Sequence, residues 1–322
     1  MFWFIPVVIG LLAIYFVRRL IPRAKVDVKG KYVLITGCDS GFGRETAIKL
    51  DEMGVCVMAT CLTKAGEQSL KSVTSDKLKT FQMDVTNSQQ INDVCKEVKG
   101  QIACGAATGL WGLVNNAGIL QTLPIEWTPL NTFKRIADVN LWGMIDVTKT
   151  FLPLVKKARG RVVNFSSGTG LLSLNFFAPY AISKFGVEAF SDALRREMHP
   201  WGIKVSIMEP GAFKTQMNNS SVREIQLKQG WDNLNDDLKE EYGENYLEKS
   251  ITFLTATPPS SHIPQVSDAV VDALTSQSPR DRYLVGLDAW FITAWMARLP
   301  TFVADFIITH VLCGNIVPQG SK

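Results

Sequence analysis

Short, continuously apolar runs alternate with amphipathic segments along most of the chain, and this alternation constrains the fold more than any other feature. The runs typical of buried strands are Tyr32–Thr36, Val55–Thr60, Leu78–Met83, Leu110–Asn115, Arg161–Ser166 and Ile203–Met208. The segments typical of helices are Arg44–Met53, Ser88–Val98, Leu130–Lys156 and Tyr180–His199. Runs that are apolar throughout indicate strands covered on both faces. The pattern predicts an α/β fold, a Rossmann-like doubly wound parallel sheet in a single domain.

Two stretches depart from this alternation. Residues Ala212–Pro264 are polar and helix-prone, and we interpret them as an insertion over the sheet edge. Residues Ala289–Leu312 are strongly apolar, but Arg298, Pro300 and Asp305 interrupt them, which argues against a membrane-spanning helix. A helix packed on the core and a surface that dips into a membrane remain equally compatible with this pattern.

The N-terminus resembles a membrane anchor. Residues Met1–Val17 carry no charge and, as a helix, would span ~25 Å of a ~30 Å hydrocarbon core. A cleaved signal peptide would have its basic residues before the apolar run, whereas here they follow it. We therefore expect an uncleaved anchor at residues 1–24, a globular domain at 25–288 and an apolar extension at 289–322. The positive-inside rule then puts the globular domain in the cytosol.

The net charge of +4 lies within the first 25 residues. The chain has 34 basic and 30 acidic residues, and Arg18, Arg19, Arg23 and Lys25 account for the whole excess. The neutral remainder lacks the basic surface that nucleic-acid binding requires, so that class of partner is excluded. The six cysteines form no CxxC pair and no His-paired spacing, so we expect reduced thiols and no metal site.

A glycine-rich loop follows the first expected strand and precedes a helix. It reads Thr36-Gly37-Cys38-Asp39-Ser40-Gly41-Phe42-Gly43. Glycines let the backbone approach a pyrophosphate, and a helix N-terminus offers it free N–H groups. In this context the loop predicts a bound dinucleotide, contacted by Gly37, Ser40, Gly41, Phe42 and Gly43.

Charge near the adenosine ribose decides between NAD and NADP. A 2′-phosphate needs a cation, but the loop offers Ser40 beside the acid Asp39. The end of the second strand, Ala59–Leu62, has neither a base nor an acid, and we assign Arg44 to the pyrophosphate or the surface. These residues favour NAD, with NADP as the alternative. The pair Asp84-Val85, after the third strand, is expected at the adenine edge.

Tyr180 and Lys184 stand four residues apart on an expected helix and therefore share one face. A free phenol has a pKa of ~10, which is too high for a base at neutral pH. A nearby ammonium group lowers the pKa of the phenol. The pair can therefore accept or deliver a hydroxyl proton during hydride transfer.

The order of motifs resembles the short-chain dehydrogenase/reductase family over roughly residues 30–290. The motifs are Thr36–Gly43, Asn115-Asn116-Ala117-Gly118, Asn140, Ser167, Tyr180 with Lys184, and Pro210-Gly211. Each motif is weak alone, but the ordered set is specific. The resemblance implies the same Rossmann-like fold and a nicotinamide cofactor.

The resemblance also implies individual roles. Tyr180 is then the general acid/base, Lys184 lowers its pKa and binds the nicotinamide ribose, and Ser167 positions the substrate oxygen. Asn140 is expected to hold a water that continues the proton path. The remaining residues expected in the cofactor cleft are Asn115, Ala117, Gly118, Pro210, Gly211 and Thr215. Structural hydrogen bonds are expected of Asn164, Ser166 and Ser183.

Finer motifs are similar to the membrane-associated retinol dehydrogenases and 3α/17β-hydroxysteroid dehydrogenases. They are Gly37–Gly43, Leu110–Gly118 and Phe185–Asp192. Mitochondrial D-3-hydroxybutyrate dehydrogenase shares them; Val139–Gly143 and Ser183–Gly186 favour that enzyme, whereas the anchor favours the first group. The segment Leu172–Pro179 departs from the group, because it carries aromatic residues where glycines are usual.

The wall of the substrate pocket is expected to be apolar. Its candidate residues are Leu171, Leu172, Phe176, Phe177, Phe213 and Met217. A short hydroxy acid would need a cation there, and Lys214 is the candidate nearby. We therefore expect an oxidoreductase acting on a lipophilic alcohol, a retinol or hydroxysteroid, delivered from the bilayer that holds residues 1–21. A hydroxybutyrate dehydrogenase-like enzyme and a catalytically silent lipid-binding protein are the alternatives.

The resemblance suggests where the protein acts and how it assembles. We expect the endoplasmic reticulum membrane, with a mitochondrial membrane as the alternative. A homodimer through the long helices that follow the fourth and fifth strands is also expected.

Overall fold

A seven-stranded parallel sheet forms the centre of the computed structural model, which describes residues 23–105, 107–256, 260–314 and 316–321. The strands are β1 (Tyr32–Ile35), β2 (Cys56–Cys61), β3 (Lys79–Gln82), β4 (Gly112–Asn115), β5 (Arg161–Phe165), β6 (Lys204–Pro210) and β7 (Arg282–Val285). Their order is β3-β2-β1-β4-β5-β6-β7, and every pair is parallel. The order reverses between β1 and β4, and such a reversal opens a crevice beyond the carboxyl ends of the strands.

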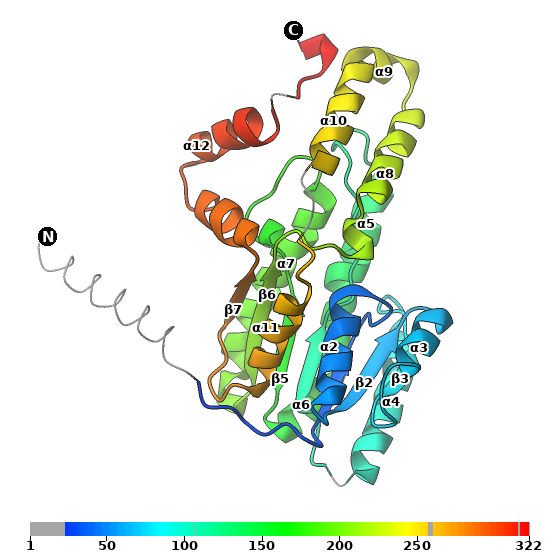
Figure 1. The fold of residues 1–322 in the computed structure, drawn as a ribbon, viewed down its shortest axis with the longest axis vertical. Helices are drawn as coiled ribbons and strands as arrows, with labels where there is room; N and C mark the ends of the chain where they lie inside the picture. Colours follow the sequence, from blue (N-terminus) through cyan, green and yellow to red (C-terminus); the bar gives the residue numbers. More distant parts are fainter. Residues whose placement is uncertain (1–22, 106, 257–259, 315, 322) are drawn as a thin grey trace, which may run out of the picture.

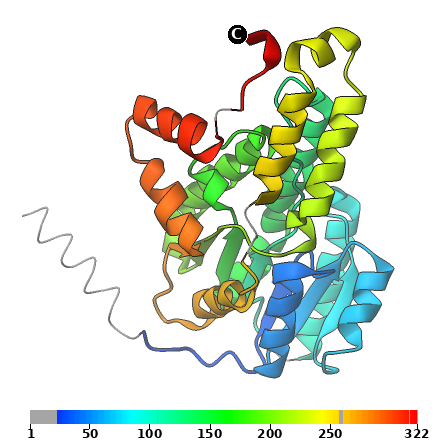
Figure 2. The same cartoon turned by 45° about the horizontal axis from the view of Figure 1, so that its top comes forward.

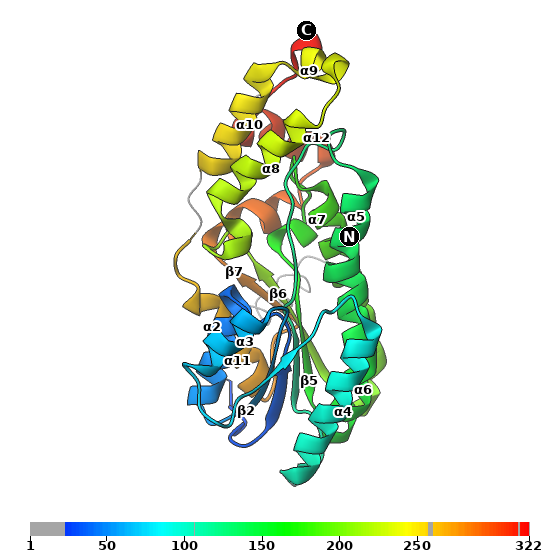
Figure 3. The same cartoon turned by 90° about the vertical axis from the view of Figure 1, so that its right-hand side faces the viewer.

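Helices cover both faces of the sheet (Figures 1 and 3). One face carries α2 (Gly41–Glu52) and α11 (Pro264–Thr275), and α3 (Lys64–Lys71) lies between β2 and β3 in the chain. The other face carries α4 (Ser88–Cys104), α6 (Met144–Ala158) and α7 (Ala178–Met198). Each face has its own buried apolar cluster, as the continuous apolar strands require. The expected doubly wound sheet is confirmed.

The segment expected over the sheet edge lies elsewhere. Its helices α8 (Ser220–Asp232), α9 (Asp236–Tyr242) and α10 (Glu244–Ala256) stand beyond the sheet, at its carboxyl end (Figures 1 and 2). An aromatic cluster of Trp127, Trp231, Tyr242, Tyr246, Phe176 and Phe253 holds them to the rest of the chain. Because aromatic side chains bury large areas, these contacts fix the segment above the crevice.

The C-terminal extension forms short helical segments rather than one long helix. They are η5 (Ala289–Ala294), α12 (Thr301–Phe306) and η6 (Ile307–Leu312). Met296, Ile308 and Cys313 are buried and pack with Leu172 and Leu174. Among the described residues, no helix is long and apolar enough to cross a membrane. The anchor expected at residues 1–24 lies, except for its last two residues, outside the described part of the chain.

Candidate active site

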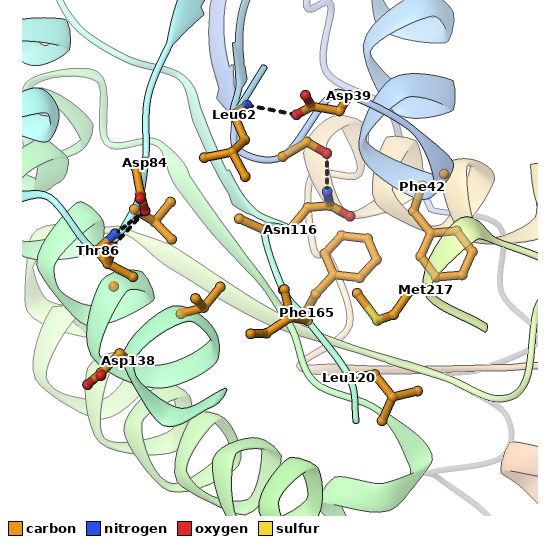
Figure 4. Close-up of a pocket in the computed structure, with 18 of the residues that line it drawn as sticks. Asp39, Phe42, Leu62, Asp84, Thr86, Asn116, Leu120, Asp138, Phe165 and Met217 are labelled. Atoms are coloured by element: carbon orange, nitrogen blue, oxygen red, sulfur yellow. Dashed lines mark hydrogen bonds between the residues drawn. The ribbon is translucent and has the colours of Figure 1, made fainter. Parts of the chain in front are cut away.

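A cavity of about 1050 Å³ opens at the carboxyl ends of the strands (Figure 4). The residues expected at the cofactor that line it are Gly37, Ser40, Gly41, Phe42, Asp84, Val85, Ala117, Gly118, Tyr180, Lys184, Pro210 and Thr215. Gly43, Asn115 and Gly211 were expected there too, but they do not line this cavity. The cavity therefore joins the glycine loop to the Tyr180–Lys184 pair in one continuous space.

The glycine loop packs tightly against the segment that follows β4. Gly37 has a φ of +70°, and a Cβ on it would lie 2.8 Å from Cα of Ala117. A Cβ on Gly43 would lie 2.5 Å from the carbonyl oxygen of Gly37. The side-chain amide of Asn116 donates to the carbonyl oxygens of Thr36 and Gly37, at 2.9 Å each. The two glycines are thus required by close backbone approach.

Asn116 lines the cavity but was missing from the expected site residues, although its neighbours were included. By contrast, Asn115 is buried beneath the cavity. Its amide donates to Thr148 Oγ1 and Asn164 Oδ1, at 2.8 Å each. Asn164 in turn donates to Ser191 Oγ at 2.9 Å. Asn115 and Asn164 therefore make buried hydrogen bonds that link β4, β5 and the helices. This structural role was expected for Asn164, whereas Asn115 was expected in the cofactor cleft.

The acid Asp39 lies at the end of the cavity that is next to the carboxyl end of β2. Asp39 accepts a hydrogen bond from the backbone N–H of Leu62 at 2.8 Å (Figure 4) and another from that of Thr63 at 2.9 Å. All three residues line the cavity. Arg44 is turned away, because its Nη2 donates to the carbonyl oxygen of Ser69 at 3.0 Å. The fixed charge at this end of the cavity is therefore negative.

Tyr180 and Lys184 lie one turn apart on α7 and both line the cavity. Lys184 Nζ donates to the carbonyl oxygen of Phe165 at 2.8 Å and lies 5.4 Å from the centre of the Tyr180 ring. Burial raises the pKa of Tyr180 to about 12, and a hydrogen bond with the Ser167 hydroxyl partly offsets this rise. Burial lowers the pKa of Lys184 to about 8, and the negative charge of Glu188 partly offsets this fall. At neutral pH the phenol therefore keeps its proton while most of the lysine stays charged.

Asn140 lies in a π-helical turn, η1 (Asp138–Gly143), between α5 (Leu130–Ala137) and α6. It is 1% exposed and does not line the cavity. Its Nδ2 donates to the carbonyl oxygen of Ile119 at 2.9 Å and to Ser183 Oγ at 3.0 Å, and its Oδ1 accepts from the N–H of Ile119 at 2.8 Å. Asn140 therefore fixes the cavity wall at Ile119, and Ser183 has the structural role expected of it. A water held by Asn140 stays a prediction.

The side chains expected at the substrate are arranged differently from the expectation. Phe213 is 2% exposed and packs edge-on against Phe42 at 5.6 Å, inside the core. Phe176 is buried in the aromatic cluster against Tyr246 and Phe253. Phe177 lies beneath the Arg223 guanidinium, 5.8 Å from it.

None of these three phenylalanines lines the cavity, and neither does Ser167. Ser166, expected to be purely structural, does line it, as does Met217. Ser167 Oγ accepts from the N–H of Thr169 at 3.2 Å. Lys214 is exposed outside the cavity, whereas Arg135 lines it and donates to Gln121 at 3.0 Å. Sequence reasoning missed Arg135 because the residue lies in α5, between the motifs Asn115–Gly118 and Asn140, and belongs to neither.

Comparisons with known proteins agree with this geometry. A family model described as short chain dehydrogenase matches residues 31–226. Rat retinol dehydrogenase 7 is 45% identical over 305 residues, which are 93% of this chain and 95% of the rat protein. Human 17-beta-hydroxysteroid dehydrogenase type 6 is 43% identical over 286 residues, 88% of this chain and 89% of the human protein. A solved short-chain dehydrogenase from Streptomyces avermitilis has a TM-score of 0.69 at 26% identity, covering 86% of this chain and 97% of the bacterial one.

Proposed function

Since the chain belongs to the short-chain dehydrogenase family, we propose that it transfers a hydride between a nicotinamide cofactor and the CH–OH group of a lipophilic alcohol, a retinol or a hydroxysteroid. The observation that carries this proposal is the cavity itself. The close-packed glycine loop forms one end of the cavity, and Tyr180 and Lys184 line the same cavity. A dinucleotide has its phosphates and its reactive ring far apart, and such a cavity accommodates both.

The residues of the cavity fit a nicotinamide dinucleotide. The backbone approaches so closely at Gly37 that a methyl group would clash with Ala117, and this leaves the N–H groups at the start of α2 open to a pyrophosphate. When bound, the nicotinamide supplies the hydride acceptor or donor. Gly37, Ser40 and Gly41 would hold the pyrophosphate, and Lys184 would hold the ribose next to the ring.

The proton chemistry falls to Tyr180. In alcohol oxidation its phenolate accepts the hydroxyl proton of the substrate, and in carbonyl reduction its phenol donates one. Because burial alone raises the pKa of Tyr180, the positive charge of Lys184 is needed to stabilise the phenolate. Ser167 contributes through its hydrogen bond to Tyr180, which orients the phenol toward the substrate oxygen.

NAD is the proposed cofactor. Support comes from Asp39, whose carboxylate is locked by two backbone N–H groups at the wall of the cavity where a ribose 2′-oxygen would lie. A 2′-phosphate would meet this fixed negative charge, and Arg44 is engaged elsewhere. A substrate panel run with both cofactors tests the choice: higher kcat/KM with NADP than with NAD contradicts it.

A lipophilic alcohol is favoured by the names of two close relatives, a retinol dehydrogenase and a hydroxysteroid dehydrogenase. The cavity wall beyond Tyr180 includes the apolar side chains Leu120, Met217 and Val222. A short hydroxy acid has a specific candidate partner in the guanidinium of Arg135. The panel therefore includes retinol, 3α- and 17β-hydroxysteroids and 3-hydroxybutyrate.

Tyr180→Phe is the decisive variant. We expect turnover of the preferred alcohol to fall by roughly 10²–10⁴-fold, because the ring keeps its shape but loses its transferable proton. Cofactor affinity should stay within about threefold of wild type, because the phenol is not expected to hold the phosphates. A wild-type chain that oxidises none of the alcohols, or a variant that is equally active, contradicts the proposed function.

The protein is further proposed to work at a membrane, with residues 1–24 as its anchor, residues 25–288 as the catalytic domain and residues 289–322 against the bilayer. Exposed aromatic side chains of the extension, Trp295, Phe302 and Phe306, support the last point. The proposed location is the endoplasmic reticulum, with the catalytic domain in the cytosol and a mitochondrial membrane as the alternative. Protease protection of the catalytic domain in intact microsomes would contradict the cytosolic orientation.

A homodimer through α7 and the helices after β4 is also proposed. These helices leave three large apolar side chains exposed, Trp142, Ile182 and Phe185. Exposed apolar side chains of this kind are typical of a surface that a second subunit covers. Sedimentation of the wild-type protein as a monomer contradicts this arrangement.

A further inference from the structure

Charged side chains are buried between α7, β6 and β7, apart from the residues that line the cavity. Glu188 on α7 is 8% exposed and Glu209 on β6 is 0% exposed. Nη1 of Arg282, on β7, donates to Glu209 Oε1 at 2.6 Å and also to Glu188 Oε2. Its Nη2 lies 3.3 Å from Asp192 Oδ1. One guanidinium therefore serves two buried carboxyl groups that the proposed reaction does not use.

Of the other charges around the pair, Asp192 already has its own partners, and Lys184 Nζ donates to the carbonyl oxygen of Phe165. The charged and titratable groups that face Glu188 and Glu209 in the described residues are Lys184, Asp192 and Arg195 from α7 and Arg282 from β7. Asp192 is paired with Arg195 at 3.0 Å and with Arg196 at 3.6 Å. Arg282 is therefore the cation that is hydrogen-bonded to both Glu188 and Glu209.

Each carboxyl group also has one oxygen without a donor. Glu188 Oε1 and Glu209 Oε2 are buried and have no well-aligned hydrogen-bond partner among the described residues. The Ser166 hydroxyl is close enough to Glu188 to lower the pKa of that carboxyl in part, against the effect of burial. If both carboxyls were ionised, they would share one hydrogen-bonded cation in a buried place, and such incomplete pairing is costly. Burial raises the pKa of both groups, and repulsion from Glu188 adds to the rise at Glu209, whose pKa reaches about 7. A proton held in common removes both problems, because it brings the two carboxyls and Arg282 together to zero charge and gives the free oxygens a shared partner.

This cluster is in direct contact with the active site. Glu188 lies one turn after Lys184 on α7, and its charge raises the pKa of that lysine against the effect of burial. A Cβ on Gly170 would touch Ser166 Oγ and lie 3.3 Å from Glu188 Cγ. Glu188 therefore supports both Lys184 and the turn Ser166–Gly170, which carries Ser167.

Building on the proposed dehydrogenase activity, we propose that Glu188 and Glu209 share one proton under the guanidinium of Arg282, and that this carboxyl pair is a positioning site for Lys184. With the proton present, two carboxyls and one guanidinium sum to zero charge. When the proton leaves to solvent at higher pH, one negative charge appears one helical turn from Lys184. That charge favours the ammonium form of the lysine, so the pair extends the pH range in which Lys184 stabilises the Tyr180 phenolate.

The pH dependence of kcat/KM for alcohol oxidation tests the pair in the full chain. We expect the alkaline limb of Glu188→Gln to move to lower pH by about one unit, because the acid nearest Lys184 is gone. Glu209→Gln should also move the alkaline limb to lower pH, but by a smaller amount. Glu197→Gln, an exposed acid on the same helix, is the matched control and keeps the wild-type limb. An unchanged limb in both variants of the pair overturns the proposal, whatever happens to kcat.

Infrared spectroscopy tests the shared proton without any turnover. A protonated carboxyl has a carbonyl stretching band that an ionised carboxylate lacks. We expect this band in the wild-type protein at neutral pH, its loss on raising the pH, and its absence from Glu188→Gln and Glu209→Gln. A wild-type protein without the band overturns the shared proton. Because this measurement needs no substrate, it separates failure of this inference from failure of the proposed function, which would show as inactivity toward every alcohol.

Discussion

Gly37 is the position where one added methyl group would do most damage to the cofactor loop. Its φ of +70° disfavours any side chain, and a Cβ would come within 2.8 Å of the Ala117 backbone. We expect Gly37→Ala to lower NADH affinity at least tenfold, because the loop must move away from the pyrophosphate. The strain should also cost about 1–3 kcal/mol of unfolding free energy. Fluorescence titration with NADH and thermal unfolding measure the two effects.

Gly100→Ala is the matched control for this change. Gly100 lies within α4, where an added Cβ meets no atom within 4 Å. Alanine should stabilise the helix by about 0.5–1 kcal/mol and leave NADH affinity unchanged. Similar losses of affinity in both variants would show that the constraint does not lie at the loop.

Asp39 is expected to decide which nicotinamide cofactor is used. Asp39→Asn keeps an oxygen that can accept from the N–H of Leu62 or Thr63 but removes the negative charge from the cavity wall. We expect the ratio of kcat/KM for NADP to that for NAD to rise roughly tenfold, which corresponds to about 1.4 kcal/mol. Asp76→Asn, an exposed acid away from the cavity, should leave the ratio unchanged. An unaltered ratio in Asp39→Asn would mean that this carboxylate does not face the ribose.

The sequence placed residues well where a local motif fixes them. Tyr180 and Lys184 meet in one cavity because four residues make about one helical turn, and the loop glycines meet the cavity because they follow a strand. Phe213 could not be placed this way, since its direction depends on Phe42, which is remote in sequence. The direction of the Asn115 side chain could not be foreseen for the same reason: its partners Thr148 and Asn164 come from other elements.

At the scale of elements, the long helix after β4 differs from its periodic pattern. The segment Leu130–Lys156 was expected as one α-helix, and α5 and α6 are indeed joined without a break in the helical path. The π-helical turn η1 between them adds a residue per turn and directs Asn140 inward to Ile119 and Ser183. A π turn costs backbone hydrogen bonding and is kept where such a side chain is needed. Hydrophobic periodicity cannot reveal it, because both helix types are amphipathic.

The segment between Ser167 and α7 depends on a strained residue. Phe176 has a φ of +74° and is buried against Tyr246 and Phe253 of α10. Phe176→Ala should destabilise the protein by about 3–5 kcal/mol, because a buried aromatic ring is lost. Phe176→Gly should be more stable than Phe176→Ala by about 1 kcal/mol, because glycine tolerates the positive φ. Chemical denaturation of both variants measures this order.

Phe177 provides the matched comparison next in the chain. Its φ of −104° is ordinary, so Phe177→Ala should be more stable than Phe177→Gly. The same order of alanine and glycine at both positions would show that Phe176 carries no strain. The aromatic replacement of usual glycines in this segment, noted in the sequence, would then serve packing alone.

At the scale of the whole molecule, the first six strands of the sheet were predictable, but the seventh strand and the helices above the crevice were not. Six strands and their parallel arrangement follow from the alternating pattern, and each strand lies within two residues of its expected bounds. The seventh strand, β7, has only four residues and pairs only with β6. It comes after the long segment α8–α11, where the alternation is lost. The position of α8–α10 above the crevice depends on the aromatic cluster, which joins residues more than a hundred positions apart.

The C-terminal extension has two unlike faces, which explains why its sequence fitted two interpretations. Its inner side packs on Leu172 and Leu174, next to the turn that carries Ser167. Its outer side leaves Phe302 77%, Trp295 65% and Phe306 60% exposed. A group of aromatic side chains left in water is unfavourable, and the interface of a bilayer is the environment that suits them. The inner side of the extension is therefore a core element, and its outer side is the surface that we propose to face a membrane.

This arrangement predicts a specific fluorescence result. In the full chain bound to vesicles that contain brominated lipid, Trp295 should lie within quenching distance of the acyl chains. The quenched part of the total tryptophan emission should therefore fall in Trp295→Phe. Trp201→Phe is the matched control, because Trp201 is also exposed but follows the far end of α7, under Lys156. Equal quenching in wild type and Trp295→Phe would mean that residues 1–24 alone hold the protein at the bilayer, with the extension facing water.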